Sequence, residues 1–174
     1  DRLEKSRHYQ YDVYRLAQRL VRERGCESLL DVGCGPATKV AMLLTNLVRN
    51  ITLVDQPNCG TLVRHFASNA RFIPADLETI NTDLTETFDL VLCADVLEHL
   101  YNPIPCLNFI RRHLRPNGLA IISTPERDIL RGRSCTECTH PSHVREWNRT
   151  EFLNLLTANG FSVNHHFLFP TSRL

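Results

Sequence analysis

A chain of 174 residues is long enough for one domain with a full hydrophobic core, which we expect over residues 1–174. Hydrophobic residues make up 43% and charged residues 22%, a balance that excludes a disordered chain. A net charge of +1 gives no general attraction to nucleic acid or to a membrane surface, and no apolar run approaches the ~20 residues that a membrane-spanning helix needs. We therefore expect no membrane partner, and the net charge argues against a nucleic-acid partner.

Cysteine usage indicates a reducing compartment. Seven cysteines are present, an odd number. Five of them stand singly within or beside predicted elements: Cys26, Cys34, Cys59, Cys93 and Cys106. Because disulfides are rare in the cytoplasm and free cysteines behave as small buried hydrophobic residues, we expect reduced thiols in a cytoplasmic protein.

Residues 1–25 are expected to contribute an N-terminal helix that precedes the sheet. Apolar residues between positions 8 and 24 recur at the spacing of one helical face. They are Val13, Leu16, Ala17, Leu20 and Val21. Gly25 is expected to end this helix.

A buried strand and a glycine turn come next. The strand is predicted over residues 28–32, and Gly33 and Gly35 follow it, before a helical segment. Glycine permits a tight turn and lets the backbone approach a bound molecule, while a helix N-terminus favours anionic groups. The third glycine of the dinucleotide fingerprint is missing, because Thr38 occupies its position.

Further strands alternate with helical segments along the chain. Apolar runs predict strands at residues 51–55, 71–76, 88–93 and 119–123. This alternation predicts an α/β domain, a three-layer doubly wound Rossmann-like sheet that is mostly parallel and has helices on both faces. Residues 161–169 alternate between apolar and polar, which predicts an antiparallel C-terminal strand.

An acid ends the second strand 24 residues after Asp31. In doubly wound folds a carboxylate at a similar offset, ~20 residues, binds ribose hydroxyls. A carboxylate can accept two hydrogen bonds from a cis-diol, and this is the role that we expect of Asp55.

Taken together, these stretches resemble class I S-adenosylmethionine-dependent methyltransferases. The glycine turn, Asp-x-Gly-x-Gly-x-Ala, resembles motif I of that family, with Ala37 where the third glycine usually stands. Residues 95–100, Asp-x-x-Glu-His-Leu, resemble the run at the methyl-transfer end of the site, and Pro-Asn-Gly at 116–118 resembles the loop before the fifth strand. Residues 123–128 and 143–147 also resemble small bacterial methyltransferases that modify glycans or secondary metabolites.

The resemblance implies S-adenosylmethionine as the cofactor. Motif I would hold its methionine end and Asp76 its adenine amino group. The cofactor-binding residues that we expect are Asp31, Gly33, Cys34, Gly35, Asp55, Gln56, Asp76, Leu77, Cys93 and Ala94.

Residues 125–147 are expected to form the substrate-side loop. Loops beyond the carboxyl ends of parallel strands bind substrates in α/β folds. Arg127, Arg131 and Arg145 suit an acceptor with an anionic group, such as a phosphate or a carboxylate. A solvated surface explains these arginines equally well, because acidic residues in the same segment partly balance their charge.

Three residues are candidates for catalysis. His143 is the candidate general base, because a hydroxyl acceptor must lose its proton and imidazole titrates near neutral pH. Asp95 and His99 belong to the run that the resemblance places at the methyl-transfer end. The alternative is that His143 packs the loop and proximity alone drives transfer.

Two sets of residues carry side chains of the types that bind metal ions. The first is Cys135, Cys138, His140 and His143, whose spacing is much shorter than in ordinary zinc modules. The second is Asp95, Glu98, His99 and His143, which resembles the metal-binding set of small-RNA 2′-O-methyltransferases. Because Glu-His after the fourth strand is also common in metal-free methyltransferases, we assign no metal from the sequence.

The sequence favours an S-adenosylmethionine-dependent O-methyltransferase that acts on a small-molecule or glycan acceptor. The alternatives are an RNA 2′-O-methyltransferase and a cofactor-binding domain without catalysis. The absence of a basic patch interleaved with aromatic residues argues against the RNA substrate.

Overall fold

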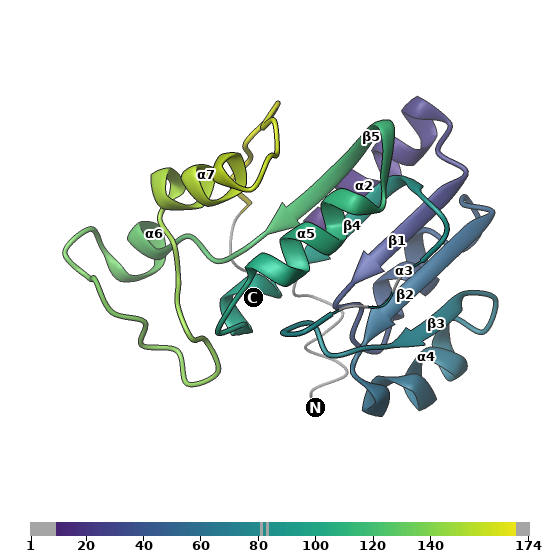
Figure 1. Cartoon of the computed structure of the whole chain (residues 1–174), viewed down its shortest axis with the longest axis horizontal. Coiled ribbons are helices and arrows are strands. Elements are labelled where there is room, and N and C mark those ends of the chain that lie inside the picture. Colours follow the sequence, from purple (N-terminus) through teal and green to yellow (C-terminus); the bar gives the residue numbers. More distant parts are fainter. Residues whose placement is uncertain (1–9, 81, 83, 170–174) are drawn as a thin grey trace.

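One parallel sheet is the centre of the computed structural model, which describes residues 10–80, 82 and 84–169 (Figure 1). The strands of this part of the chain are β1 (Ser28–Val32), β2 (Asn50–Asp55), β3 (Arg71–Pro74), β4 (Phe88–Ala94) and β5 (Leu114–Ser123). They lie in the order β3-β2-β1-β4-β5, and each pairing is parallel. The central strands β1 and β4 are buried on both faces, as their nearly continuous apolar runs require.

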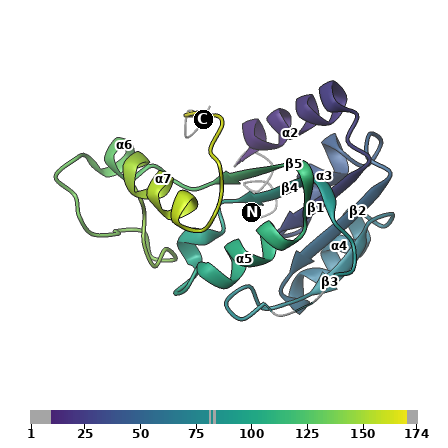
Figure 2. The ribbon, with the colours of Figure 1, turned by 45° about the horizontal axis from the view of Figure 1, so that its top comes forward.

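Helices cover both faces of the sheet. They are α2 (Tyr11–Arg24), α3 (Thr38–Leu43), α4 (Gly60–Phe66), α5 (Ile104–Arg112), α6 (Arg127–Arg131) and α7 (Arg149–Ala158). α2, α3 and α4 share one core with Leu29 of β1, whereas α5 and α7 share another with its neighbour Leu30. Figure 2 shows α2 and α5 on opposite sides of the sheet. The predicted three-layer arrangement is therefore confirmed.

The strand order reverses at β1, and we use the word crevice for the space outside the carboxyl ends of β1, β2 and β4 at this reversal. β1 is followed by β2 on one side, but β4 pairs with the opposite side of β1. The connections after β1 and β4 therefore leave the sheet in opposite directions. Ligands bind at such a switch point, outside the carboxyl ends of the strands.

The predicted antiparallel C-terminal strand is wrong. Residues 161–169 form no strand, and all the strands of the described residues are parallel. Phe161 and Val163 pack against the core, but Phe167, Leu168 and Phe169 are exposed. Alternation predicts which side chains share a face, but a strand also needs a neighbouring strand with which to pair its backbone.

Other boundaries differ in smaller ways. α2 is observed from Tyr11, and positions 8 and 9 of the predicted helix lie outside the described residues. β5 begins at Leu114 because the predicted loop at 116–118 is a register irregularity within the strand, with Asn117 at φ 64°. The segment 125–147 contains the short helix α6, whose first turn is capped by the Glu126 side chain.

No helix among the described residues has the length and apolar character needed to cross a membrane.

Candidate functional site

The turn after β1 is held against β2 by its backbone. The N–H groups of Gly33 and Cys34 both donate to the Val54 carbonyl, at 2.8 and 3.3 Å. Gly33 and Gly35 have φ values of 80° and 55°, which disfavour any residue with a Cβ. A Cβ on Gly33 would overlap the Val96 side chain, but one on Gly35 would meet no atom within 4 Å. Gly33 is thus needed for packing, whereas open space lies beside Gly35.

Asp55 connects this turn to the end of β2. Its Oδ2 accepts a hydrogen bond from the Gly35 N–H at 2.6 Å, and its Oδ1 accepts one from the Gln56 N–H at 2.7 Å. A carboxylate has about four acceptor positions, so lone pairs remain for ribose hydroxyls. Asp55 is half-buried and Gln56 is exposed, so both are accessible at the crevice. These features fit the nucleoside part of S-adenosylmethionine.

Asp31 lies behind the turn rather than in the crevice. It is fully buried, and its Oδ2 accepts a 2.8 Å hydrogen bond from the hydroxyl of Tyr14 on α2. Its Oδ1 is buried with no hydrogen-bond partner. Burial raises the pKa of Asp31 to about 7, although Tyr14 and Lys39 act in the opposite direction. This carboxyl therefore supports the turn from α2, a connection that the sequence did not indicate because Tyr14 lies within an ordinary amphipathic pattern.

The ends of β3 and β4 complete the crevice. Asp76 is exposed, and its Oδ1 accepts from the Glu78 N–H, whereas Leu77 lies in the core. Cys34 and Cys93 are buried thiols. The carbonyl of Ala94 accepts a 3.0 Å hydrogen bond from the Gln10 side chain, so the residue before α2 reaches this edge of the sheet. Gln10 was missed from the sequence, since nothing near it marks a site.

Asp95 stands at the carboxyl end of β4 in a left-handed conformation, with φ 51°. Its Oδ1 accepts a 2.6 Å hydrogen bond from the hydroxyl of Ser123 at the end of β5, and its N–H donates to the Ser123 carbonyl. These bonds hold a strained backbone in place, as at many functional sites. Asp95 is half-buried, so its carboxylate borders the crevice beside η2 (Leu97–His99).

The two predicted catalytic histidines lie together. The rings of His99 and His143 are 4.8 Å apart between centroids, edge to face. His99 Nδ1 lies 2.7 Å from the Ser142 carbonyl, and His143 Nδ1 lies 2.8 Å from Oε1 of Glu146. Because both partners are acceptors, each Nδ1 carries the hydrogen, so the neutral form of each ring has its lone pair on Nε2. Burial lowers the pKa of His143, against the effect of Glu146.

Glu98 is buried beside these histidines. Its side chain has no exposed surface, and neither carboxylate oxygen has a hydrogen-bond partner. Burial, with the charge of Asp95, raises the pKa of Glu98 to about 8. The Thr124 hydroxyl is near enough to favour the charged form, but it does not reach hydrogen-bond geometry. The Glu98 carbonyl accepts from the N–H groups of Val144 and Arg145, which fastens the loop to η2.

The predicted substrate arginines have different environments. Arg127 makes a two-pronged contact with Glu151, at 2.7 and 2.9 Å. Arg131 binds the buried carboxylate of Glu146 in the same manner, at 3.0 and 3.1 Å. Arg145 donates to the Tyr101 carbonyl and lies 6.0 Å from the centre of the Trp147 ring, it has no carboxylate partner among the described residues, and its side chain is exposed. Two of the three arginines thus have carboxylate partners within the loop and α7, which sequence spacing did not indicate.

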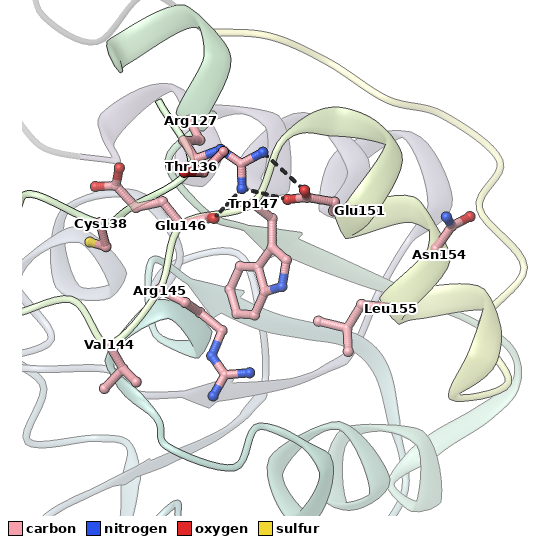
Figure 3. Close-up of a pocket in the computed structure, with 10 residues that line it drawn as sticks. All are labelled: Arg127, Thr136, Cys138, Val144, Arg145, Glu146, Trp147, Glu151, Asn154 and Leu155. Carbon is pink, nitrogen blue, oxygen red and sulfur yellow. Dashed lines mark hydrogen bonds and ion pairs between the residues drawn. The ribbon is translucent and has the colours of Figure 1, made fainter. Parts of the chain in front are cut away.

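A pocket of about 590 Å³ opens between the loop and α7 (Figure 3). Ten residues line it: Arg127, Thr136, Cys138, Val144, Arg145, Glu146, Trp147, Glu151, Asn154 and Leu155. Figure 3 shows Trp147 in the middle of this group, with Arg145 and Leu155 on either side of its ring. Glu146 connects the pocket to the histidines, because it also binds His143.

The sequence considered Cys135, Cys138, His140 and His143 as a zinc site without assigning it, and the structure does not bring the four ligand atoms together, although the rings of His140 and His143 stack at 3.8 Å. Cys138, His143 and Glu146 offer ligand atoms within 4.8 Å of one another, but Cys135 and His140 belong to no such group among the described residues. Glu98, His99 and His143 form a second group within the same limit, without Asp95.

Comparisons with known proteins agree with this geometry. A family model described as a methyltransferase domain matches residues 6–166. The chain is 34% identical over 104 residues to a ubiquinone biosynthesis O-methyltransferase of Rickettsia akari, covering 57% of this chain and 40% of that protein. The chain thus spans about two fifths of the length of this relative.

Solved structures share the fold at lower identity. A putative O-methyltransferase from Nostoc punctiforme superposes with a TM-score of 0.71 at 18% identity, over 95% of this chain and 54% of that one. The plantazolicin methyltransferase BamL, solved with a substrate analogue and SAH, gives a TM-score of 0.68 at 18% identity, over 87% and 61%. Since the family model matches residues 6–166, the chain belongs to the methyltransferase domain family of class I S-adenosylmethionine-dependent methyltransferases.

Proposed function

We propose that the protein transfers the methyl group of S-adenosylmethionine to a hydroxyl oxygen of a small-molecule or glycan acceptor. The cofactor would lie across the carboxyl ends of β1, β2 and β3, with its ribose at Asp55 and its adenine at Asp76. The observation that carries this proposal is the Gly35–Asp55 hydrogen bond, which presents an open glycine and a carboxylate side by side. Oxygen as the methylated atom is supported by the name of the Rickettsia akari relative.

The acceptor would occupy the pocket between the loop and α7. The pocket combines the apolar surfaces of Trp147, Leu155 and Val144 with the exposed cation of Arg145. A flat apolar wall with one cation suits a compact acceptor that carries an anionic group. The carboxylate partners of Arg127 and Arg131 support a scaffold role in the free protein, so Arg145 is the first candidate to contact the acceptor.

Loss of the acceptor proton would depend on the residues at the end of β4. The sulfonium methyl is already activated, so the protein positions the acceptor and removes its proton. His143 is oriented by Glu146 and keeps its Nε2 lone pair, while His99 and Asp95 border the same space. We assign the catalytic roles to these three residues. The seven cysteines, none in a disulfide, support the cytoplasm as the location of this reaction.

A turnover screen tests the proposed function. The purified chain is incubated with methyl-labelled S-adenosylmethionine and a panel of phenols, sugars and their phosphorylated or carboxylated forms, and labelled products are identified by mass spectrometry. We expect label on an oxygen atom, and His143→Ala should lower turnover by about 10²–10⁴-fold with cofactor affinity unchanged. Tight cofactor binding without turnover of any acceptor would favour the non-catalytic alternative, and RNA as the best acceptor would contradict the small-molecule assignment.

A further inference from the structure

We propose that Glu78, on the turn after β3, is a positioning residue that connects the cofactor site to the acceptor pocket. Three hydrogen-bonded contacts in series make this connection, from Asp76 through Glu78 and Tyr101 to Arg145. The inference rests on the proposed function, since it takes the adenine to lie at Asp76 and the anionic group of the acceptor at Arg145. It adds that a bound cofactor places Arg145 for the acceptor.

The first contact lies within the turn itself. Oδ1 of Asp76 accepts a 3.0 Å hydrogen bond from the N–H of Glu78. Asp76 is exposed just beyond the carboxyl end of β3, whereas Leu77, between the two acids, lies in the same hydrophobic core as Leu100. The side chain proposed for the adenine therefore also holds the backbone of Glu78. A ligand that orders Asp76 would order this backbone as well.

The second contact crosses from the turn to the segment between η2 and α5. Oε1 of Glu78 accepts a 2.6 Å hydrogen bond from the N–H of Tyr101, and Oε2 accepts one of 3.1 Å from the N–H of Asn102. One carboxylate thus uses both oxygens on two consecutive backbone groups. Hydrogen bonds to an ionised acceptor are roughly twice as strong as neutral ones. The N-terminal end of α5, which begins at Ile104, also favours a negative charge nearby.

The third contact reaches the acceptor pocket. The carbonyl of Tyr101 accepts a 2.7 Å hydrogen bond from Nη2 of Arg145, whose guanidinium carbon lies 6.0 Å from the centre of the Trp147 ring (Figure 3). The backbone N–H of Arg145 is held separately, because it donates to the Glu98 carbonyl. The Tyr101 carbonyl therefore sets the direction of the guanidinium rather than the path of the loop. The Arg145 side chain is exposed, and without this acceptor it would change rotamer readily.

The guanidinium of Arg145 accordingly has two arrangements, one bonded to the Tyr101 carbonyl beside Trp147 and one that extends into solvent. A cofactor at Asp76 favours the first, because it fixes the turn that carries Glu78. Coupling between two binding sites is reciprocal, so an anionic acceptor should bind more tightly to the cofactor-loaded protein, and the cofactor more tightly when the acceptor is present.

A second route joins the acceptor pocket to the end of β4. Glu146 lines the pocket and binds His143, whose ring lies beside that of His99. This route does not pass through Glu78. A substitution of Glu78 therefore separates the two routes, because it interrupts the first and leaves the second in place.

The experiment uses Trp147, the single tryptophan of the chain, as the reporter, and it needs no acceptor. The chain is titrated to saturation with S-adenosylhomocysteine while calorimetry measures binding and tryptophan emission is recorded. We expect the emission of the wild type to change at saturation, and this change to be lost in Glu78→Ala although the ligand still binds. Glu78→Gln keeps one acceptor oxygen and should keep part of the change. Glu86→Ala, which removes an exposed acid that pairs with Arg71, is the control and should keep all of it.

Arg145→Ala tests the other end of the connection. We expect it to bind S-adenosylhomocysteine and to lose the emission change. Glu78→Ala combined with Arg145→Ala should behave like either single variant, because each substitution interrupts the same series of contacts. An additional loss in the combined variant would show that the two residues act independently, and it would overturn the proposal.

A full emission change in saturated Glu78→Ala would also overturn the proposal, because the signal would then pass through another route, such as that of Glu146. So would a wild type that binds S-adenosylhomocysteine with no change of emission. A wild type that does not bind this ligand would overturn the proposed function, and this inference with it. Circular dichroism shows whether each variant is folded. If Glu78→Ala does not fold, Glu78→Gln decides, and a full change in Glu78→Gln would then contradict the role of Glu78.

Discussion

The N–H of Gly35 donates a 2.6 Å hydrogen bond to Oδ2 of Asp55, and this bond joins the turn after β1 to the end of β2. One carboxylate thus fixes the shape of the turn and faces the position proposed for the ribose. Cofactor binding and the order of the turn should therefore change together when Asp55 is altered.

Asp55→Ala should weaken binding of S-adenosylmethionine and of S-adenosylhomocysteine by at least about tenfold, since a hydrogen bond to a charged group contributes roughly 1.5–3 kcal/mol. Isothermal titration calorimetry measures both affinities. Glu86→Ala, which removes an exposed acid that pairs with Arg71, is the control and should bind normally. Equal affinity in Asp55→Ala and the wild type would remove Asp55 from the cofactor site.

Gly33→Ala should destabilise the fold far more than Gly35→Ala. Both residues have positive φ, which costs about 1–3 kcal/mol for a residue with a side chain, but only the Cβ on residue 33 would overlap Val96. Chemical denaturation measures the free energy of unfolding. In a Val96→Ala background the additional cost of Gly33→Ala should fall, because the overlapping methyl group is gone. An unchanged cost would assign the whole effect to the backbone.

The titration of Asp31 should lower the free energy of unfolding as pH rises. Its folded-state pKa is raised from 3.8 to about 7 by burial, so between these pH values the folded state holds a proton that the unfolded state has lost. Unfolding free energy should thus decline from about pH 4 to pH 7, by at most about 4 kcal/mol from this group, and stay level above. Asp31→Asn should lack this part of the decline, and the exposed Asp12→Asn should keep it. Parallel pH profiles for wild type and Asp31→Asn would contradict the raised pKa.

Arg131→Ala should lower the melting temperature by several degrees. It removes both hydrogen bonds from the guanidinium to Glu146, whose side chain has no exposed surface, and it leaves a buried carboxylate with His143 as its partner. Differential scanning calorimetry measures the change. Arg131→Ala combined with Glu146→Gln should recover part of the loss, because the unpaired charge is then absent. A melting temperature equal to that of the wild type would show that this pair is dispensable.

Arg145→Ala should affect the acceptor and spare the fold. The side chain is exposed and, within the described part of the chain, has no carboxylate partner, so we expect a nearly unchanged melting temperature and a raised KM for an anionic acceptor. Arg133→Ala, another exposed arginine of the same loop, serves as the control. Steady-state kinetics measure KM for the anionic acceptor in each variant. If KM for the anionic acceptor stays the same in Arg145→Ala, this arginine does not bind it.

The layers, the parallel strands and the crevice could be predicted because they follow from local patterns. Apolar runs marked β1 and β4, and the position of Asp55 at a strand end followed from the strand itself. The roles of Asp31 and Gly33 could not be predicted in full, because they depend on Tyr14 and Val96, which lie far away in the chain. Motif resemblance selects residues, but their environment is set by tertiary packing.

The partners of the loop arginines could not be predicted from the sequence either. A cluster of cations in a loop is compatible with a ligand or with internal ion pairs, and composition cannot distinguish them. Glu146 and Glu151 lie 15 and 24 residues from their arginine partners, and only the fold shows that each carboxylate faces a guanidinium. The expected C-terminal strand was wrong for a related reason, since pairing depends on a neighbour that alternation alone does not supply.

The double contact of the loop with the Glu98 carbonyl has a consequence for the thermodynamics of acceptor binding. The backbone N–H groups of Val144 and Arg145 are hydrogen-bonded to η2, and the Arg127 N–H donates a further hydrogen bond to the Trp147 carbonyl. The conformational entropy of this loop is therefore lost during folding, before any acceptor arrives. We expect acceptor binding to carry little entropic penalty from ordering the loop. Substitutions that weaken these backbone hydrogen bonds should therefore lower the affinity for the acceptor as well as the stability of the fold.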